Sequence, residues 1–257
     1  MALAVSIGGA LQRQQTEEEL RQRTDELQTH NEELDAFAHT VAHDLQSPLS
    51  PIVGFASILK NEYTTLSPAE IEEFADRIIR NGNKMSDIIR ELLLLAQIRK
   101  TDIRPEPLNM AFIVGETLQR LASMTEEYQA EITLPESWPV ALGYGPWIEE
   151  VWANYISNAM KYGGRPPHLE LGATVENSAD FTSPAVRFWV RDNGPGLTPD
   201  EQAKLFAQFT RLHQVRAKGQ GLGLSIVRRI INKLDGKTGV ESQVGQGSVF
   251  SFTLPAG

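Results

Sequence analysis

The residue pair His43-Asp44 carries the first chemical signal of the chain, because a carboxylate directly follows an imidazole in a segment with helical periodicity. Neighbouring helical residues point about 100° apart, so Asp44 flanks the imidazole and can accept its Nδ1 proton. The lone pair of Nε2 is then available to attack phosphorus. Pro48 removes one helical hydrogen bond and is expected to bend the helix beside this pair.

His39 precedes His43 by four residues, a spacing that brings two side chains onto one helix face. The two imidazoles could in principle share a metal ion, but no third ligand is evident nearby, so a nucleophilic histidine is the better interpretation. The chain contains no cysteine, which excludes disulfides, thiolate metal sites and cysteine nucleophiles.

A second polar pattern lies on a helix predicted over residues 147–161. Asn154, Asn158 and Lys161 recur at positions i, i+4 and i+7, and therefore line one face of that helix. Amide oxygens suit a hard cation such as Mg²⁺, and a lysine suits a phosphate. The alternative is the polar face of an ordinary helix, which this pattern alone would favour.

Two glycine-rich turns complete the set of chemical signals. In the first, Asp192-Asn193-Gly194-Pro195-Gly196, a carboxylate at a strand end could accept a hydrogen bond from an exocyclic amine, beside a backbone that can approach a flat ring. The second, residues 219–223, opens a predicted helix, where free N–H groups form an anion cradle. It is no dinucleotide-binding motif, because residues 209–218 read as a loop and not as the preceding strand that motif needs.

The front of the chain must position the histidine, and its pattern is wholly helical. Leu20, Leu27, Leu34 and Val41 recur every seven residues, which favours a coiled coil over residues 12–35, although a solvated single helix remains the alternative. Apolar stripes over residues 37–59 and 71–95 predict a helical hairpin, with a new helix start at Ser67-Pro68-Ala69-Glu70. Two such hairpins make a four-helix bundle, so we expect a dimer.

The back of the chain must position the amides and the glycine turns, and here the pattern mixes helices with strands. Residues 104–107 (Arg-Pro-Glu-Pro) mark the boundary. The predicted helices cover residues 111–128, 147–161 and 223–234, and the predicted strands cover residues 131–134, 168–175, 185–192, 238–244 and 248–254. Mixed helices and antiparallel strands favour a two-layer α/β sandwich.

Composition excludes several classes of protein. The 257 residues carry 24 Lys+Arg and 33 Asp+Glu, for a net charge of -9, which argues against nucleic acid as a partner. No apolar run is long enough to span a bilayer, and the apolar start, residues 2–11, lacks the basic front end of a signal peptide. We expect the tail of a preceding domain there, with a clipped membrane segment as the alternative. We also expect a cytoplasmic location in a parent chain that could itself be membrane-tethered.

Each pattern is weak or moderate alone, but their order and spacing together are specific. The chain resembles the sensor histidine kinases of two-component signalling over nearly its whole length. The phosphoacceptor box of that family matches His43-Asp44 with Pro48-Leu49, and its asparagine box matches residues 154–162. The other matches are the first glycine box at Asp192, Gly194 and Gly196, the phenylalanine box at Leu205-Phe206 with Phe209 and Arg211, the second glycine box at Gly219, Gly221, Leu222, Gly223 and Leu224, and the final turn at Gly245–Ser248 with Phe250.

This resemblance implies a dimeric four-helix bundle followed by an ATP-binding α/β sandwich of the GHKL (Bergerat) type. The implied domains are a signalling helix at residues 1–35, a dimerisation and phosphotransfer domain at 36–104, and a catalytic domain at 105–257. The implied partners are a second copy through the hairpin and N-terminal helix, a response-regulator receiver domain, and an upstream sensory domain in a longer parent chain.

The resemblance also implies a role for each matched residue, with ATP and Mg²⁺ as cofactors. His43 takes the γ-phosphoryl group, with Asp44 as its general base. Asn158 binds Mg²⁺, while Asn154 and Lys161 lie at the phosphates. Around the nucleotide, Tyr162 packs by the adenine, Asp192 with Gly194 and Gly196 reads its amine, and the lid over the phosphates includes Arg211, Gly219, Gly221, Leu222 and Gly223.

Three positions depart from the family pattern. Ser47 replaces the Thr or Asn that positions water in many members, which puts phosphatase activity in doubt. The turn Gly143-Tyr144-Gly145 replaces the usual acidic turn, which is expected to loosen helix entry, and Val249 replaces a frequent Thr beside the nucleotide.

Two other functions compete with a kinase. Related GHKL ATPases hydrolyse ATP with a Glu four residues before the metal-binding Asn, but Asn154 occupies that place here, so a general base for water is missing. The other alternative is a nucleotide-gated dimeric scaffold without kinase activity, which the full set of boxes disfavours.

Overall fold

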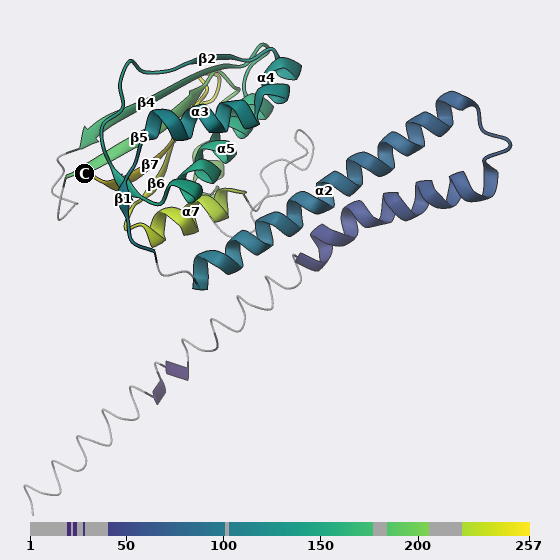
Figure 1. The fold of residues 1–257 in the computed structure, drawn as a ribbon, viewed down its shortest axis with the longest axis horizontal. Coiled ribbons are helices and arrows are strands. Elements are labelled where there is room, and N and C mark those ends of the chain that lie inside the picture. Colours follow the sequence, from purple (N-terminus) through teal and green to yellow (C-terminus); the bar gives the residue numbers. More distant parts are fainter. Residues whose placement is uncertain are drawn as a thin grey trace, which may run out of the picture. The chain divides into compact units, whose positions relative to one another are not determined.

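The computed structural model describes residues 41–100, 103–176, 184–205 and 223–257, together with Leu20, Arg21, Arg23, Thr24 and Gln28 (Figure 1). The predicted coiled coil therefore falls almost wholly outside the described residues, and so does the predicted lid with its phenylalanine box from Phe206 onward. The chain divides into two compact units within one long helix, between Ser86 and Asp87. Each unit is described by itself below.

The first unit contains the predicted helical hairpin up to Ser86, and the rest of its second helix belongs to the second unit. Residues 41–62 are helical, and α2 spans Pro68–Lys100 after a short turn. The predicted helix start is confirmed, because Ser67 Oγ accepts a hydrogen bond from the Glu70 N–H and Glu70 Oε2 accepts one from the Ser67 N–H at 2.8 Å. Phe55 stacks on Phe74 with ring centroids 5.3 Å apart, which joins the two arms of the hairpin.

The hairpin arms also carry apolar side chains that the single chain leaves uncovered. Leu49, Val53 and Ile79 are 44%, 56% and 59% exposed. Leu49 and Val53 are four residues apart and therefore lie on one helix face. Such a face favours packing against another helical surface, because exposing it to water costs roughly 25 cal/mol per Å² of apolar area.

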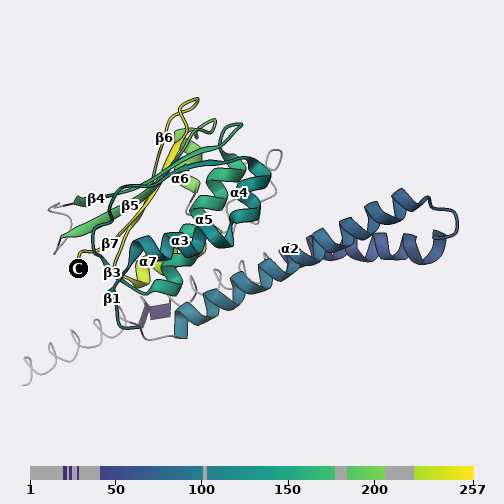
Figure 2. The same cartoon turned by 45° about the horizontal axis from the view of Figure 1, so that its top comes forward.

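The second unit is a two-layer α/β sandwich, as predicted. Its five-stranded sheet has the order β2-β4-β5-β7-β6, with all neighbours antiparallel except β2 and β4, which run parallel. Helices lie against one face of the sheet (Figure 2). The strands are β2 (Glu131–Thr133), β4 (His168–Glu176), β5 (Ala185–Asp192), β6 (Thr238–Ser242) and β7 (Ser248–Pro255), and the helices are α3 (Met110–Arg120), α4 (Ala122–Tyr128), α5 (Gly145–Tyr162), α6 (Pro199–Lys204) and α7 (Gly223–Lys233).

Aromatic side chains fasten α5 to the sheet. Trp152 and Tyr155 are buried between the layers, and Trp152 packs edge-to-face on Phe252 of β7 at 5.3 Å between centroids. Tyr155 Oη donates a hydrogen bond to the Ser251 carbonyl at 3.1 Å, and burial raises the pKa of that phenol. These contacts fix the rotation of α5, and so they decide which of its faces points away from the sheet.

Several secondary-structure elements differ from those predicted from the sequence. The single helix predicted over residues 111–128 is two helices, α3 and α4, because Leu121 leaves helical geometry (φ -96°, ψ 8°). Three short elements were missed: α6, which opens with a Thr198–Glu201 capping box, and the pair β1 (Glu106–Pro107) and β3 (Leu142–Gly143). Two-residue strands carry too little periodicity to be read from a sequence.

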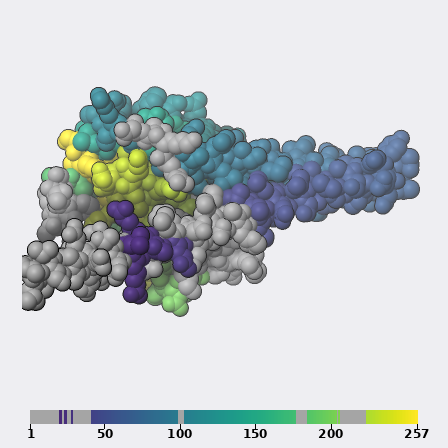
Figure 3. Space-filling model, turned by 90° about the horizontal axis from the view of Figure 1, so that it is seen from below, coloured from purple at the N-terminus to yellow at the C-terminus, as the bar shows by residue number. Residues whose placement is uncertain are grey.

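Helix α7 of the second unit has one buried side and one exposed side. Its buried side carries Ile226, Val227, Ile230 and Ile231, while Arg228, Arg229 and Lys233 are exposed. Figure 3 shows this helix, in yellow-green, at the surface of the molecule. None of the described helices is both long and apolar enough to cross a lipid bilayer.

Candidate functional site

The histidine and the carboxylate after it lie on the helical segment 41–62, in sharply different environments. The side chain of His43 is 63% exposed, whereas that of Asp44 is only 2% exposed. His43 Nδ1 lies 3.2 Å from Asp44 Oδ1, so the contact expected from their adjacency is present. An imidazole held through Nδ1 by a carboxylate presents Nε2 on the opposite side of the ring. The arrangement suits an exposed nucleophile with a buried proton acceptor.

Two neighbours complete this part of the helix. Pro48 is buried and Ser47 is exposed, and the helix runs continuously through both positions. Pro48 cannot donate a backbone hydrogen bond to the Asp44 carbonyl one turn earlier.

The predicted polar face of α5 is present in the second unit. Asn158 Nδ2 donates a hydrogen bond to Asn154 Oδ1 at 3.0 Å, and both residues are half-buried, as is Lys161 one turn later. Because this bond uses the amide nitrogen of Asn158, the Oδ1 of Asn158 keeps its capacity to accept a hydrogen bond or a cation. The three side chains lie together as predicted from the sequence.

The start of α7 lies directly against this face. Gly223 is the first residue of α7, and a Cβ at this position would overlap the side-chain amide of Asn154. A side chain at position 223 would therefore displace the Asn154 amide from its observed place. Gly223, a member of the second glycine box, thus meets the asparagine face, although the two are some seventy residues apart in the sequence. The other predicted members of that region, Arg211, Gly219, Gly221 and Leu222, lie outside the described residues.

Asp192 ends β5 and is almost fully buried, with 7% of the residue exposed. Its Oδ1 accepts a hydrogen bond from the Gly194 N–H at 2.8 Å. Burial raises the pKa of this carboxyl above its ordinary value, while the backbone N–H groups of Gly194 and Ser248 act in the opposite direction. A carboxylate that is held by two backbone donors is fixed in orientation, which suits recognition of a donor group such as an amine.

Gly194 contacts both the Asp192 carboxylate and the Tyr162 carbonyl. Tyr162 is the last residue of α5 and is 39% exposed, and burial of its ring raises the pKa of its phenol. The Tyr162 carbonyl lies close to Gly194, so the end of α5 and the turn after β5 are in contact. Gly196 lies against Gln243 in the turn between β6 and β7.

Asn193 is a structural member of the site that the motif comparison left without a role. Its Oδ1 accepts hydrogen bonds from the Gly164 and His168 N–H groups, both at 2.9 Å, and its Nδ2 donates to the Pro166 carbonyl at 3.1 Å. One amide thus joins the turn after β5 to the loop between α5 and β4. The signal available in the sequence was an Asn in a glycine turn, where such side chains commonly bond to backbone.

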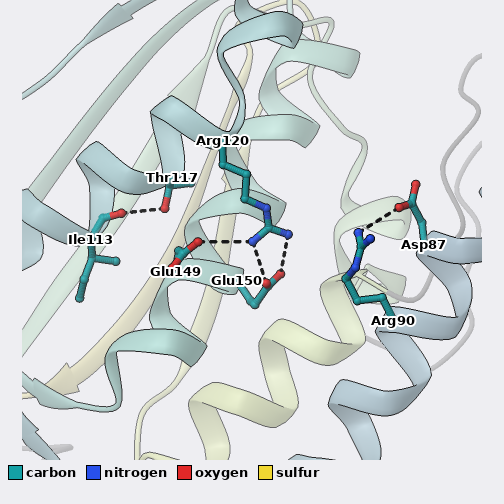
Figure 4. Close-up of polar contacts among 7 residues, drawn as sticks. All are labelled: Asp87, Arg90, Ile113, Thr117, Arg120, Glu149 and Glu150. Carbon is teal, nitrogen blue, oxygen red and sulfur yellow. Dashed lines mark hydrogen bonds and ion pairs between the residues drawn. The ribbon is translucent and has the colours of Figure 1, made fainter. Parts of the chain in front are cut away.

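A charged cluster anchors the first half of α5 to α3. Arg120 donates two hydrogen bonds to Glu150, at 2.7 Å and 3.3 Å, and one to Glu149 at 3.5 Å (Figure 4). The bond to Glu150 raises the pKa of the guanidinium above its usual value. Glu150 lies one turn before Asn154, so this contact holds the helix segment that carries the asparagine face.

Mg²⁺ is the metal that the resemblance implies. No cluster of three or more His, Asp or Glu side chains that could hold a metal occurs among the residues that the structure describes. Mg²⁺ takes oxygen ligands and is usually held by one or two protein groups together with substrate phosphates and water. The Oδ1 of Asn158 fits that pattern, because it would supply one oxygen and leave the remaining positions to phosphate and water.

Comparison with known proteins yields two family models, which match successive parts of the chain. Residues 33–101 match the His Kinase A (phospho-acceptor) domain. Residues 143–257 match the histidine kinase-, DNA gyrase B- and HSP90-like ATPase. With a phosphoacceptor domain followed by this ATPase domain, the chain belongs to the sensor histidine kinases, and the predicted fold class is confirmed.

Individual relatives agree with this assignment. The chain is 33% identical over 259 residues to the methanogenesis regulatory histidine kinase FilI of Methanothrix harundinacea, with 98% of this chain and 29% of that protein covered. It therefore spans less than a third of that relative's length.

Two solved structures share the fold. Full-length ShkA in complex with AMPPNP is similar with a TM-score of 0.59 and 25% identity over 85% of this chain and 45% of that chain. Histidine kinase ThkA in complex with the response regulator protein TrrA is similar with a TM-score of 0.66 and 21% identity over 86% of this chain and 61% of that chain.

Proposed function

We propose that this chain is the kinase core of a two-component sensor, which phosphorylates His43 with ATP and passes the phosphoryl group to an aspartate of a response regulator. The observation that carries the proposal is the pairing of an exposed imidazole with a buried carboxylate at 3.2 Å. The same chain holds an asparagine face and a fixed, buried Asp192 beside glycine turns. A nucleophile and a nucleotide site together are what phosphoryl transfer requires.

The proposed transfer moves the γ-phosphoryl group from ATP to His43. The Nε2 lone pair of His43 forms a bond to the γ-phosphorus, and the bond from that phosphorus to the bridging oxygen breaks, so that ADP leaves with the electron pair. The Nδ1 proton moves to Asp44, whose Oδ1 is placed to accept it. The product is a phosphoramidate, which is reactive enough for onward transfer to a carboxylate.

The proposed nucleotide site consists of the residues that were predicted from the sequence. Asp192 would accept a hydrogen bond from the adenine amine, and Tyr162 would pack beside the ring. Lys161 would contact the phosphates, and Asn158 would hold Mg²⁺ through Oδ1 with Asn154 next to it. A bound Mg²⁺ would neutralise charge that develops on the phosphates. Full-length ShkA, which shares this fold, binds AMPPNP.

ATP hydrolysis is the less favoured alternative. Asn154, four residues before Asn158, already accepts the hydrogen bond of Asn158 through its Oδ1. A neutral amide has no basic group that could take a proton from water at neutral pH. The site therefore favours transfer to a histidine over transfer to water.

A homodimer, a receiver domain and an upstream sensory domain are the proposed partners. The exposed side chains of Leu49, Val53 and Ile79 support dimerisation through the hairpin, as the sequence predicted. The complex of ThkA with a response regulator supports the receiver. The length of FilI, of which this chain spans only part, supports a longer parent protein.

One experiment tests the proposal directly. The chain is incubated with Mg²⁺-ATP labelled in the γ-phosphate, and the label is then exposed to acid and to base. We expect stable incorporation that is lost in acid and retained in base, because a phosphoramidate hydrolyses on protonation. Release of inorganic phosphate without protein labelling would support a hydrolase. Nucleotide binding with neither reaction would support a scaffold.

Replacing Asn158 by Ala is expected to lower autophosphorylation at least about 100-fold, because the variant loses the oxygen ligand for Mg²⁺. The initial rate of labelling is measured across a range of Mg²⁺ concentrations. Asn232→Ala, an exposed position on α7, serves as the matched control and is expected to label like the parent. An Asn158→Ala protein with the parent's Mg²⁺ dependence would remove this residue from the metal role.

A further inference from the structure

Ser242 ends β6 and joins two segments that lie on either side of Asp192. Its Oγ accepts a hydrogen bond from the Leu197 N–H at 2.8 Å and donates one to the Gly247 carbonyl at 2.8 Å. It also lies 2.9 Å from Ser248 Oγ. A single half-buried hydroxyl therefore contacts both the turn after β5 and the start of β7.

Each of those segments supplies one of the backbone groups that hold the Asp192 carboxylate. Gly194 belongs to the turn that continues to Leu197, and Ser248 is the first residue of β7. Ser242 thus bonds to the turn that contains Gly194, through the Leu197 N–H, and its hydroxyl contacts the hydroxyl of Ser248.

Gly247 shows how closely these segments approach Asp192. It has a φ of +82°, and a Cβ at this residue would overlap the Asp192 carbonyl oxygen. Only glycine fits such a position without strain. The Gly247 carbonyl is the acceptor for Ser242 Oγ, so the serine holds this residue against the end of β5.

Gln202 of α6 also joins the turn after β5 to the end of β6. Its Nε2 donates to the Leu197 carbonyl at 3.1 Å and to the Ser242 carbonyl at 2.9 Å. Both the N–H and the carbonyl of Leu197 are thus tied to β6, one through the Ser242 hydroxyl and one through Gln202.

We propose that Ser242 is a positioning residue for the nucleotide site, which acts by holding the two backbone donors that orient the Asp192 carboxylate. This inference rests on the proposed role of Asp192 in binding adenine. Ser242 has no expected contact with the nucleotide or with His43. Its loss should therefore weaken binding of ATP more than it slows the transfer step.

Ser242→Ala is expected to raise the KM for ATP about tenfold and to change kcat by less than about threefold, because lost orientation of one hydrogen bond acts mainly on binding. Ser242→Thr, which keeps the hydroxyl, is expected to restore most of the ATP affinity. The KM and kcat of autophosphorylation are measured, together with the Kd of a fluorescent ATP analogue.

The matched control is Thr253→Val, at the far end of the same pair of strands. Thr253 Oγ1 accepts a hydrogen bond from the Lys237 N–H at 2.8 Å, so this variant also removes a hydroxyl that satisfies a backbone donor. It is expected to lower Tm with an unchanged KM. If Ser242→Ala does not fold, Gln202→Ala tests the same contact between the turn after β5 and the end of β6. Its expected rise in the KM for ATP is about threefold.

The possible outcomes distinguish a failure of the proposed function from a failure of the positioning role of Ser242. A parent chain that binds no ATP analogue would overturn the proposed function. A parent that binds, with both Ser242→Ala and Gln202→Ala binding equally well, would overturn only the positioning role. An equal rise in KM for Thr253→Val would also overturn it, because general destabilisation would then explain the effect.

Discussion

Replacing His43 by Gln is expected to abolish autophosphorylation, with at least about a 1000-fold loss of incorporated label. The side chain of Gln is of similar size, but its amide nitrogen has no nucleophilic lone pair for phosphorus. The nucleotide site lies on other elements of the chain, so the Kd for an ATP analogue should stay within about twofold of the parent. Label incorporation and analogue binding are measured on the same preparations.

His39→Gln is the matched control for this substitution, because His39 precedes His43 by four residues. It is expected to retain the parent's rate of labelling. If His43→Gln still accepted an acid-labile label, the assignment of the nucleophile would be wrong. If both variants lost labelling, mapping the labelled peptide of the parent would identify which of the two histidines carries the phosphoryl group.

Replacing Asp192 by Asn is expected to weaken binding of ATP about 100-fold, or about 2.7 kcal/mol. The carboxylate has two acceptor oxygens, and the backbone N–H groups of Gly194 and Ser248 already bond to it. A third donor, the adenine amine, can still be accommodated. An amide has only one acceptor oxygen, so its NH₂ group must face either a backbone N–H or the adenine amine. Isothermal titration with an ATP analogue measures the change.

Asp235→Asn is the control for this charge loss. Asp235 is exposed, lies in the turn after α7 and has a φ of +57°, a conformation that Asn adopts readily. This variant is expected to bind ATP like the parent. An Asp192→Asn protein with unchanged affinity for adenine nucleotides would remove Asp192 from base recognition, and the proposal for Ser242 would fall with it.

Most of the regular elements could be predicted from the sequence, because their patterns are local. The strand predicted over residues 185–192 has the observed bounds of β5, and the helix predicted over 147–161 lies within α5. Long amphipathic periods and explicit start signals, such as Ser67 before Pro68, identify an element without its neighbours. The break at Leu121 could not be predicted, because no Gly or Pro marks it.

The candidate site was predicted through residue types, and its supporting contacts were not. Spacing placed Asn154, Asn158 and Lys161 on one helix face, because helix faces follow from the backbone geometry alone. The roles of these residues and of Asp192 were implied by the resemblance to histidine kinases. Asn193 and Ser242 were not named, because their partners are the backbone groups of segments distant in the sequence. A serine at a strand end gives no local sign of which loop it will hold.

The order of residues already contained an imidazole beside a carboxylate, amides on one helix face, and glycine-rich turns after a strand and before a helix. The burial of Asp44 beside an exposed His43, the contact of Gly223 with Asn154, and the two backbone donors that hold Asp192 became visible only in the folded chain. The physical reason is that local patterns fix φ and ψ preferences and helix faces. Burial and hydrogen-bond partners depend on which distant segments pack together.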